Sequence, residues 1–368
     1  MLTPPRTRKP SAFLALLSLA AASAMAQLPT AADPATTLSA ITLPEKPLHV
    51  EQGERFKGLT KVALASFQLY VLTDYSASAT AQGASSRSTL AYVATDLKVT
   101  GLTPERLKAL ANSLYDDTVQ QLQAGGITVV PHAELTALPA FAALKAAGDA
   151  DGLAIDAGGG KGQVFAARDL PVIHMDEMGW MHRNSGGLFG GEKVEDPYVA
   201  LGDKMSVGFR LVKLKPALQE LAGAAGAPLL QVRLVLTAAQ LKAQGNSFFS
   251  HTAQTSAHGN LVLPSFTNRF LLMTPGGDFA RLSLDKPLVS STPLGPLKDV
   301  TSTGQTAANV AVTAFTMLAA MSGKGRGVIQ NTSELQLETN PDAFDALARP
   351  YASAVVGALA SGLSASVR

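Results

Sequence analysis

The residues best suited to chemistry lie close together between positions 174 and 182. His174, Asp176, Glu177 and His182 offer imidazole and carboxylate groups, which are common ligands of zinc and other transition metals. A metal held by this set predicts a metal-dependent hydrolase as one possible function. The spacing does not match H-E-x-x-H, and the surrounding sequence predicts a loop, which does not impose the helical geometry of that motif. We therefore also consider a polar loop without a metal.

The same loop carries four large apolar residues. Met175, Met178, Trp180 and Met181 alternate with the polar residues. Large apolar side chains outside regular structure often mark a contact surface. We predict that these four residues contact another protein.

Other patterns that could support catalysis are incomplete. Lys161 follows three glycines, but a phosphate-binding loop needs glycine where Ile155 stands and serine or threonine where Gly162 stands. No G-x-S-x-G elbow is present, and a cysteine nucleophile is excluded because the chain has no cysteine. The sequence therefore predicts no catalytic residues and no cofactor.

The first 26 residues form a predicted signal peptide. Arg6, Arg8 and Lys9 precede an apolar run at 12–22, and Ala-Met-Ala at 24–26 fits a cleavage site. The apolar run is shorter than the ~20 residues that span a bilayer. Removal of the leader changes the formal net charge from +2 to −1. A chain near neutrality lacks the positive surface that nucleic acid binding requires, so we expect no nucleic acid partner.

The absence of cysteine limits how the exported protein is stabilised and anchored. It excludes disulfides and also a lipid anchor on a lipobox cysteine. We expect the mature protein in the periplasm, free or held at the outer membrane by other contacts.

The predicted regular elements are organised around residues 59–130. Lys61–Thr73 predicts a strand rich in β-branched and aromatic residues, and residues 74–99 predict a long hairpin. Thr103–Gln123 predicts a helix, with Thr103 as N-cap and Pro104 at the first position. Ile127–Val130 predicts a short interior strand.

The remaining chain predicts further helices, strands and long loops. Residues 305–321 are mostly apolar and predict a buried helix. Asn340 caps a last helix in which Pro350 is expected to cause a kink. The other expected elements are a helix at 133–147, a loop at 149–193 with a possible short strand near 163–167, a strand at 205–214, a helix from Pro216 to 225 and a strand at 229–236.

Three stretches carry a resemblance to a known group. These are K-V-A-L-A-S-F at 61–67, L-Q-A-G-G-I-T-V-V-P at 122–131 and G-A-P-L-L-Q-V-R-L-V-L at 226–236. Together they resemble the curli secretion-channel and TolB amino-domain superfamily of bacterial envelope proteins. The resemblance covers about 59–147 and 226–236, which is under half of the mature chain. It implies a role in envelope assembly or secretion. The channel proteins are lipoproteins, and this chain departs from them in having no cysteine.

These observations predict an α/β or α+β fold: a mixed sheet with helices packed on it and long Gly/Ser-rich loop insertions. The expected organisation is a signal peptide at 1–26, a flexible arm at 27–55 and one domain at 56–368, with insertions at about 74–89, 149–193 and 245–260. The predicted function is non-enzymatic, through contacts with envelope proteins or by self-association. Two alternatives remain: a subunit of an oligomeric outer-membrane pore, since 74–82 alternates like a barrel strand, and the metal-dependent hydrolase.

Overall fold

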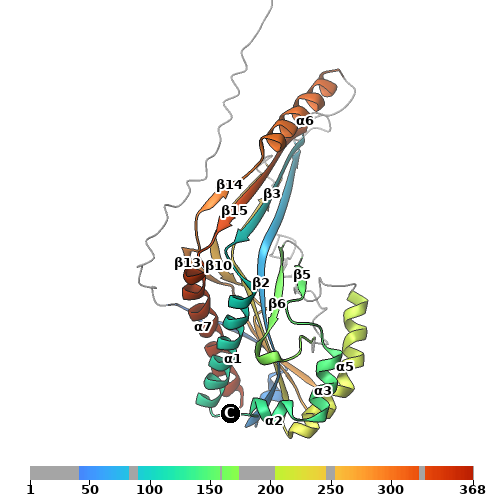
Figure 1. The fold of residues 1–368 in the computed structure, drawn as a ribbon, viewed down its shortest axis with the longest axis vertical. Helices are drawn as coiled ribbons and strands as arrows, with labels where there is room; N and C mark the ends of the chain where they lie inside the picture. The colour runs from blue at the N-terminus through green and yellow to red at the C-terminus, as the bar shows by residue number, and fades with distance from the viewer. Residues whose placement is uncertain are drawn as a thin grey trace, which may run out of the picture.

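A computed structural model describes residues 41–82, 90–157, 160–173, 204–245, 253–322 and 328–367. Its main feature is a 13-stranded sheet that contains both parallel and antiparallel pairs. This confirms the predicted mixed sheet with helices packed on it (Figure 1). The predicted signal peptide lies outside the described residues.

The strands follow one main path, β1-β12-β11-β7-β2-β3-β15-β14, with β4, β5, β6, β10 and β13 attached beside it. β8 and β9 form a separate two-stranded sheet. The bounds are β1 Leu48–Glu51, β2 Lys61–Gln82, β3 Leu90–Thr100, β4 Thr128–Val129, β5 Ala154–Ala157, β6 Gly160–Ala166, β7 Leu229–Thr237, β8 Gln240–Gln244, β9 Gln254–His258, β10 Asn260–Leu263, β11 Arg269–Met273, β12 Phe279–Leu284, β13 Leu288–Pro293, β14 Leu297–Asp299 and β15 Val328–Glu338.

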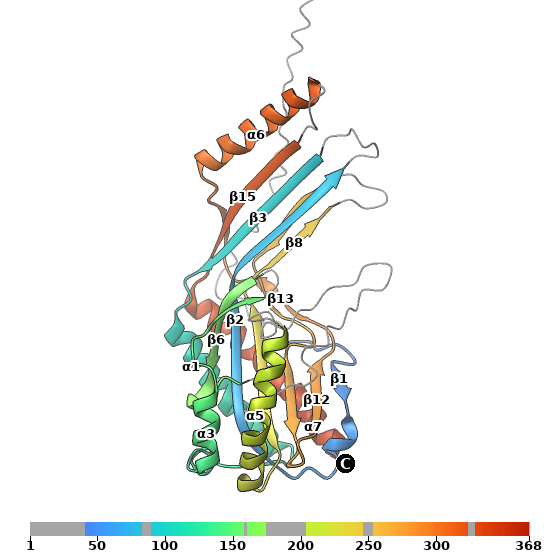
Figure 2. The same cartoon turned by 90° about the vertical axis from the view of Figure 1, so that its right-hand side faces the viewer.

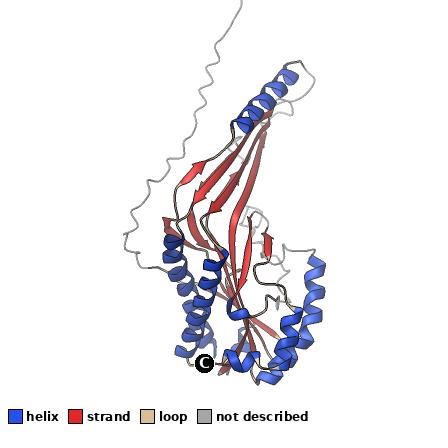
Figure 3. Ribbon diagram, viewed as in Figure 1, coloured by secondary structure: helices blue, strands red, loops and turns tan. Residues whose placement is uncertain are grey.

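Helices lie on both sides of the lower part of the sheet, with α1 and α7 on one side and α2, α3 and α5 on the other (Figures 1 and 3). α6 lies apart from them, at the opposite end of the molecule (Figure 2). The helices are α1 Pro104–Ala124, α2 His132–Thr136, α3 Pro139–Ala147, α5 Lys204–Ala225, α6 Thr303–Met321 and α7 Pro341–Val367, with short 3-10 turns η1 Gly53–Phe56 and η2 Ala167–Asp169.

The first half of β2 is the centre of the core. Every residue from Val62 to Leu72 is buried, and the strand pairs with β7 in parallel and with β6 in antiparallel register. A buried run of this kind, apolar except at Ser66 and Gln68, is expected where both faces of a strand are covered by helices. We call this lower part of the molecule, with its helix layers, the proximal body.

The second half of β2 leaves the body. The β2–β6 register shifts between Leu72 and Asp74, which marks a bulge at Thr73, and bulges bend the strand that carries them. Beyond it, β2 continues in antiparallel pairing with β3, and β3 pairs in parallel with β15 (Figure 2). We call residues 75–82, 90–95 and 328–333, together with β8, β9 and α6, the distal blade.

The helices in the body largely follow the predictions. Thr103 caps α1 by accepting a hydrogen bond from the Arg106 N–H at 3.5 Å, and Asn340 caps α7 by accepting from the Asp342 N–H at 2.8 Å. The helix expected at 133–147 is instead two helices. Leu138 is extended because the residue before a proline disfavours the helical region, and Pro139 starts α3.

Four expectations are wrong in whole or in part. The segment expected to be a loop at 149–193 contains β5, β6 and η2 in its described residues. The strand expected at 205–214 is the first half of α5, which also continues through Pro216. The arm expected to reach residue 55 ends earlier, because Leu48–Glu51 pairs with β12. The helix expected to be buried at 305–321 is present as α6, but most of its residues are exposed or half-exposed. Each expectation came from the local sequence pattern alone. The conformation or burial of each segment depends on distant residues that pack or pair with it.

Candidate functional site

The predicted metal ligands His174, Asp176, Glu177 and His182 lie outside the described residues, as do the predicted contact residues Met175, Met178, Trp180 and Met181. The structure therefore neither brings them together nor separates them. Within the described ranges, no group of three or more histidine, aspartate or glutamate side chains is placed to hold a metal ion. The chain is described up to Ile173, where the path to this loop begins.

A row of buried polar side chains on β2 and β7 makes hydrogen bonds to the backbone of residues 171–173. The Gln68 and Gln231 side-chain amides each donate a hydrogen bond to the Ile173 carbonyl at 2.5 Å. The Ser66 hydroxyl donates to the Pro171 carbonyl at 2.8 Å. Because buried amides need partners, this row fixes the segment at the point where the predicted contact loop starts.

The row continues along the sheet. The Tyr70 hydroxyl donates to Gln68 Oε1 at 2.8 Å, and the Arg233 guanidinium lies 5.3 Å from the centre of the Tyr70 ring. Arg233 is fully buried. A buried cation over an aromatic face gains cation–π energy and orders both side chains. Polar residues at these strand positions were not predicted from the sequence, because they stand inside apolar runs.

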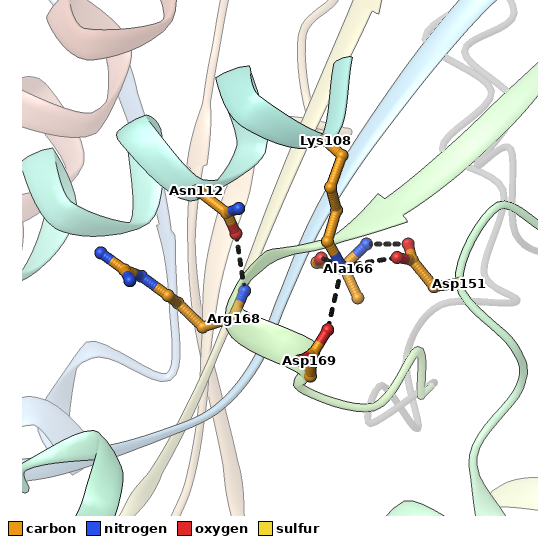
Figure 4. Close-up of polar contacts among 6 residues, drawn as sticks. All are labelled: Lys108, Asn112, Asp151, Ala166, Arg168 and Asp169. Atoms are coloured by element: carbon orange, nitrogen blue, oxygen red, sulfur yellow. Dashed lines mark hydrogen bonds and ion pairs between the residues drawn. The ribbon is translucent and has the colours of Figure 1, made fainter. Parts of the chain in front are cut away.

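A second polar cluster joins α1 to η2 (Figure 4). The Lys108 ammonium donates to Asp151 Oδ2 at 2.5 Å and to the Ala166 carbonyl at 2.6 Å, and it lies 3.5 Å from Asp169 Oδ1. Asp151 also accepts from the Ala166 N–H at 2.7 Å. Each charge in this cluster has a partner, so its role is to fix η2 against α1.

Arg168 extends this cluster. Its backbone is left-handed, with φ of 51°, and its N–H donates to Asn112 Oδ1 at 2.8 Å. One guanidinium nitrogen of Arg168, Nη2, donates to both carboxylate oxygens of Asp116, at 2.6 and 2.8 Å. A non-glycine residue in this region costs about 1–3 kcal/mol, which these contacts to α1 offset.

Beside Arg168, a cleft of about 570 Å³ opens between α1 and the chain after β4. Its polar groups come from Tyr115, Asp116, Gln120, Gln123, His132 and Arg168. Desolvation, and then the positive charge of Arg168, lower the pKa of His132, and desolvation raises the pKa of Tyr115. His132 packs edge-on against Tyr115, with ring centres 6.1 Å apart.

This cleft is poorly equipped for catalysis. Its lining contains no serine, threonine or lysine that could act as a nucleophile, and Asp116 is held by Arg168 through both oxygens. A general base needs a pKa near the working pH and a partner to act on. The lowered pKa of His132 favours its neutral imidazole, and the hydroxyl of the lining, that of Tyr115, has a pKa raised by desolvation, which disfavours its ionisation to a nucleophile.

The distal blade presents a different kind of site. Side chains of α6 hydrogen-bond the outer edge of β15: the Thr316 hydroxyl accepts from the Val328 N–H at 2.9 Å and the Thr313 hydroxyl from the Gln330 N–H at 3.1 Å. The Asn309 amide donates to the Thr332 carbonyl at 2.9 Å. An unpaired strand edge would otherwise be a template for aggregation. These side chains take the place of a neighbouring strand.

The same edge is covered further along β15. The Glu334 carbonyl accepts from the Val300 N–H at 2.9 Å, and the Glu334 N–H donates to the Thr301 hydroxyl at 2.9 Å. β14 then pairs with Leu335–Leu337. The polar residues of α6 and the segment before it therefore face the protein along the whole strand.

As a result, α6 directs its apolar side chains away from the protein. Phe315 is 74% exposed, Leu318 69% and Val310 65%. A surface helix of a globular protein normally does the reverse, with its apolar stripe toward the core. We call the exposed side chains Val310, Val312, Phe315 and Leu318 the α6 apolar face.

The blade around this face is almost free of charge. Residues 75–82, 90–95, 303–322 and 328–333 contain no Asp, Glu, Lys or Arg, although 16% of the whole chain is charged. Lys242 on β8 is the exception among the described residues of the blade, and Asp96, which pairs with Ser76, lies at its boundary with the body. Soluble surfaces typically carry ≈ 25–35% charged residues. The blade is therefore suited to contact with another component rather than to exposure to water.

The sequence of α6 contains a pattern that indicates this exposed apolar surface. Gln305, Asn309, Thr313 and Thr316 recur at intervals of four, four and three, which places them on one helical face. Such a stripe in an apolar helix indicates a polar contact on one side and an unexplained apolar face on the other. The mostly apolar composition of residues 305–321 does not by itself distinguish the polar face of the helix from its apolar face.

One described helix, α7, is long and apolar enough to cross a membrane by length and composition. In this structure it is a core helix, because it packs beside α1 and buries one side. The buried residues are Phe344, Leu347, Ala348, Tyr351, Ala352, Val355, Val356, Leu359, Ala360 and Leu363.

Comparisons of the chain with protein-family models, with curated proteins and with solved structures found no match.

Proposed function

We propose that this chain is a non-enzymatic, exported protein of the bacterial cell envelope that acts by binding other envelope components, with the distal blade as its attachment surface. The observation that supports this most is the α6 apolar face, which is exposed at the far end of the molecule (Figure 2). Exposed apolar patches on soluble proteins usually mark interaction sites. The predicted leader supplies the route to the envelope.

The predicted protein contacts through Met175, Met178, Trp180 and Met181 belong to the same proposal. The buried amides of Gln68 and Gln231 hold the chain at Ile173, directly before these residues. A fixed starting point lowers the entropy lost when a loop binds, which favours recognition. The body would then contact proteins while the blade attaches.

Fractionation of cells that express the chain with its own leader tests the proposal. We expect the wild type in the envelope pellet and the double variant Phe315→Asp/Leu318→Asp in the soluble fraction. The matched control is Val289→Asp, because Val289 is also an exposed apolar residue but lies on β13 in the body. If the double variant and the wild type fractionate alike, the blade is not the attachment surface.

The second candidate function is a subunit of an oligomeric outer-membrane pore. One observation favours it: the uncharged residues of β2 at 75–82 pair with β3 at 90–97 as a long hairpin, and the side chains alternate between small polar and apolar types. Barrel strands show such alternation over about ten residues. Ion conductance across planar bilayers, abolished by Ala79→Asp, would support a pore in place of attachment alone.

The metal-dependent hydrolase remains the enzymatic alternative. Metal analysis of the purified chain, repeated after His174→Ala and His182→Ala, tests it directly. Stoichiometric metal in the wild type and its loss in both variants would replace binding by catalysis as the leading function. Protein without metal that still fractionates with the envelope would agree with our proposal.

A further inference from the structure

We infer that the α6 apolar face binds the surface of a lipid bilayer, with the helix lying in the interfacial layer and Phe315 and Leu318 inserted among the acyl chains. This inference rests on the proposed function and names the component to which the blade attaches. Three observations favour lipid over a protein partner.

The first observation is the chemistry of the face. The exposed residues Val310, Val312, Phe315 and Leu318 are separated on the helix surface only by alanines, among them Ala311 and Ala314. None of these side chains can donate or accept a hydrogen bond. Protein interfaces typically form about one hydrogen bond per 100–200 Å² and have a polar rim. A face without such groups matches hydrocarbon better than it matches a folded partner.

The second observation is that the protein satisfies the polar groups next to this face. In a bilayer, every unsatisfied backbone group costs several kcal/mol. The Val328 and Gln330 N–H groups and the Thr332 carbonyl are bonded by α6 side chains, and the helix bonds its own backbone. The bonded groups of the β15 edge can therefore approach a medium of low dielectric with their hydrogen bonds already made.

The third observation is position and charge. α6 lies at one extreme of an elongated molecule, where a flat surface can reach it without contact with the body (Figures 1 and 2). No charged residue lies in α6 or in residues 328–333. Interfacial helices usually combine an apolar face with a basic polar face that attracts anionic lipid. Here the polar face is bonded to the sheet, so we expect binding that depends on burial rather than on headgroup charge.

Sedimentation of the chain from Gln27 onward with phosphatidylcholine vesicles tests the inference. We expect binding that persists in about 1 M salt, where the screening length falls to about 3 Å. Phe315→Asp/Leu318→Asp should lower the partition coefficient at least about tenfold, whereas Phe315→Leu and the control Val289→Asp should retain it. Circular dichroism melts of all variants check that each has folded.

A second measurement does not depend on loss of binding. Phe315→Trp introduces an indole on the face, and the wild-type signal of Trp180 is subtracted from its emission. We expect a blue shift when vesicles are added. If no variant sediments with vesicles and the emission does not shift, the inference is wrong. If the double variant nevertheless leaves the envelope pellet in cells, the partner is a protein and the proposed function stands.

A second copy of the chain is the protein partner that the experiment separates most clearly. Analytical ultracentrifugation without vesicles would then show a dimer that Phe315→Asp/Leu318→Asp dissociates. That result, together with absent vesicle binding, would overturn the lipid assignment. A monomer that binds vesicles would support it.

Discussion

The two halves of β2 lie in one continuous strand and yet belong to different environments. In the proximal body, Val62–Leu72 carries large apolar side chains that are buried on both faces. In the distal blade, residues 76–82 are Ser, Ala, Thr and Gln, and most of the described side chains are exposed or half-exposed. The body is therefore stabilised by its core, whereas the blade has little core and is stabilised by strand pairing and side-chain hydrogen bonds.

This difference indicates a division of labour. A buried core supplies folding free energy in proportion to the apolar area removed from water. A region without such a core has low local stability and is available for binding. The body therefore supplies most of the folding free energy, the blade is the part that our proposal assigns to contact, and the bulge at Thr73 lies between them.

Replacement of one large side chain in each half of the sheet compares how much side-chain burial stabilises the body and the blade. Phe67→Ala removes a fully buried ring that packs edge-on against Tyr115, and it should lower the free energy of unfolding by about 3–5 kcal/mol. Val93→Ala removes a half-buried side chain opposite Ala79 and should cost about 1 kcal/mol or less. Urea denaturation followed by circular dichroism measures both. Equal losses would show that the blade has a core of its own.

Tyr75 is the residue that joins the two halves. It is buried at the start of the blade, donates to the Leu72 carbonyl at 2.6 Å and accepts from the Ala238 and Ala239 N–H groups at 2.8 and 3.3 Å. Burial raises the pKa of its hydroxyl, so it remains a donor throughout the physiological range. The single phenol thereby links β2 to the turn between β7 and β8.

Tyr75→Phe should therefore lower the free energy of unfolding by about 1–3 kcal/mol, because it leaves buried backbone donors without an acceptor. The matched control is Tyr92→Phe on β3, whose hydroxyl makes no hydrogen bond to the described residues and whose loss should have little effect. Thermal melts of both variants give the comparison. A Tyr75→Phe melt that overlays the wild type would mean that water replaces the hydroxyl, and the joint would then be weaker than the structure indicates.

The elements predicted well from the sequence are those whose signals are local. α1 begins within one residue of its predicted start because Thr103 and Pro104 form an N-cap with proline at the first position. The strand from Lys61 is correct in type, but it ends at Gln82 rather than Thr73. The first arm of the predicted hairpin is the second half of β2, and its second arm is β3.

The elements predicted poorly depend on distant partners. The alternation of Met205, Val207 and Phe209 favours a strand, but the chain there is the first half of α5. Buried residues further along α5, such as Leu218, Leu221 and Ala222, recur with helical spacing against the body. Leu48–Glu51 has no apolar period, and its pairing with β12, more than 200 residues away, makes it a strand.

The candidate surface was only partly predictable for the same reason. Composition shows that the segment at 305–321 is apolar. Burial was the natural expectation, because most apolar helices of soluble proteins are buried. The polar edge of β15 reverses this expectation, and no property of residues 305–321 alone indicates that edge. The predicted contact residues at 175–181 lie outside the described residues, so they stay a prediction.

The smallest effect should come from the bond that orients α6. Thr316→Val keeps the side-chain shape but removes the acceptor for the Val328 N–H at 2.9 Å, and it should weaken the local contact by about 1 kcal/mol. Since the site is at the end of the blade, we expect faster amide hydrogen exchange at Val328 by about fivefold, without a change in the global melt. Ala314→Val on the outward side of α6 is the control and should leave that exchange rate unchanged.

If the amide exchanges equally fast in the wild type and in Thr316→Val, then α6 is not held to β15 by its polar stripe. The outward direction of Phe315 and Leu318, on which the contrast between body and blade depends, would then lose its physical cause.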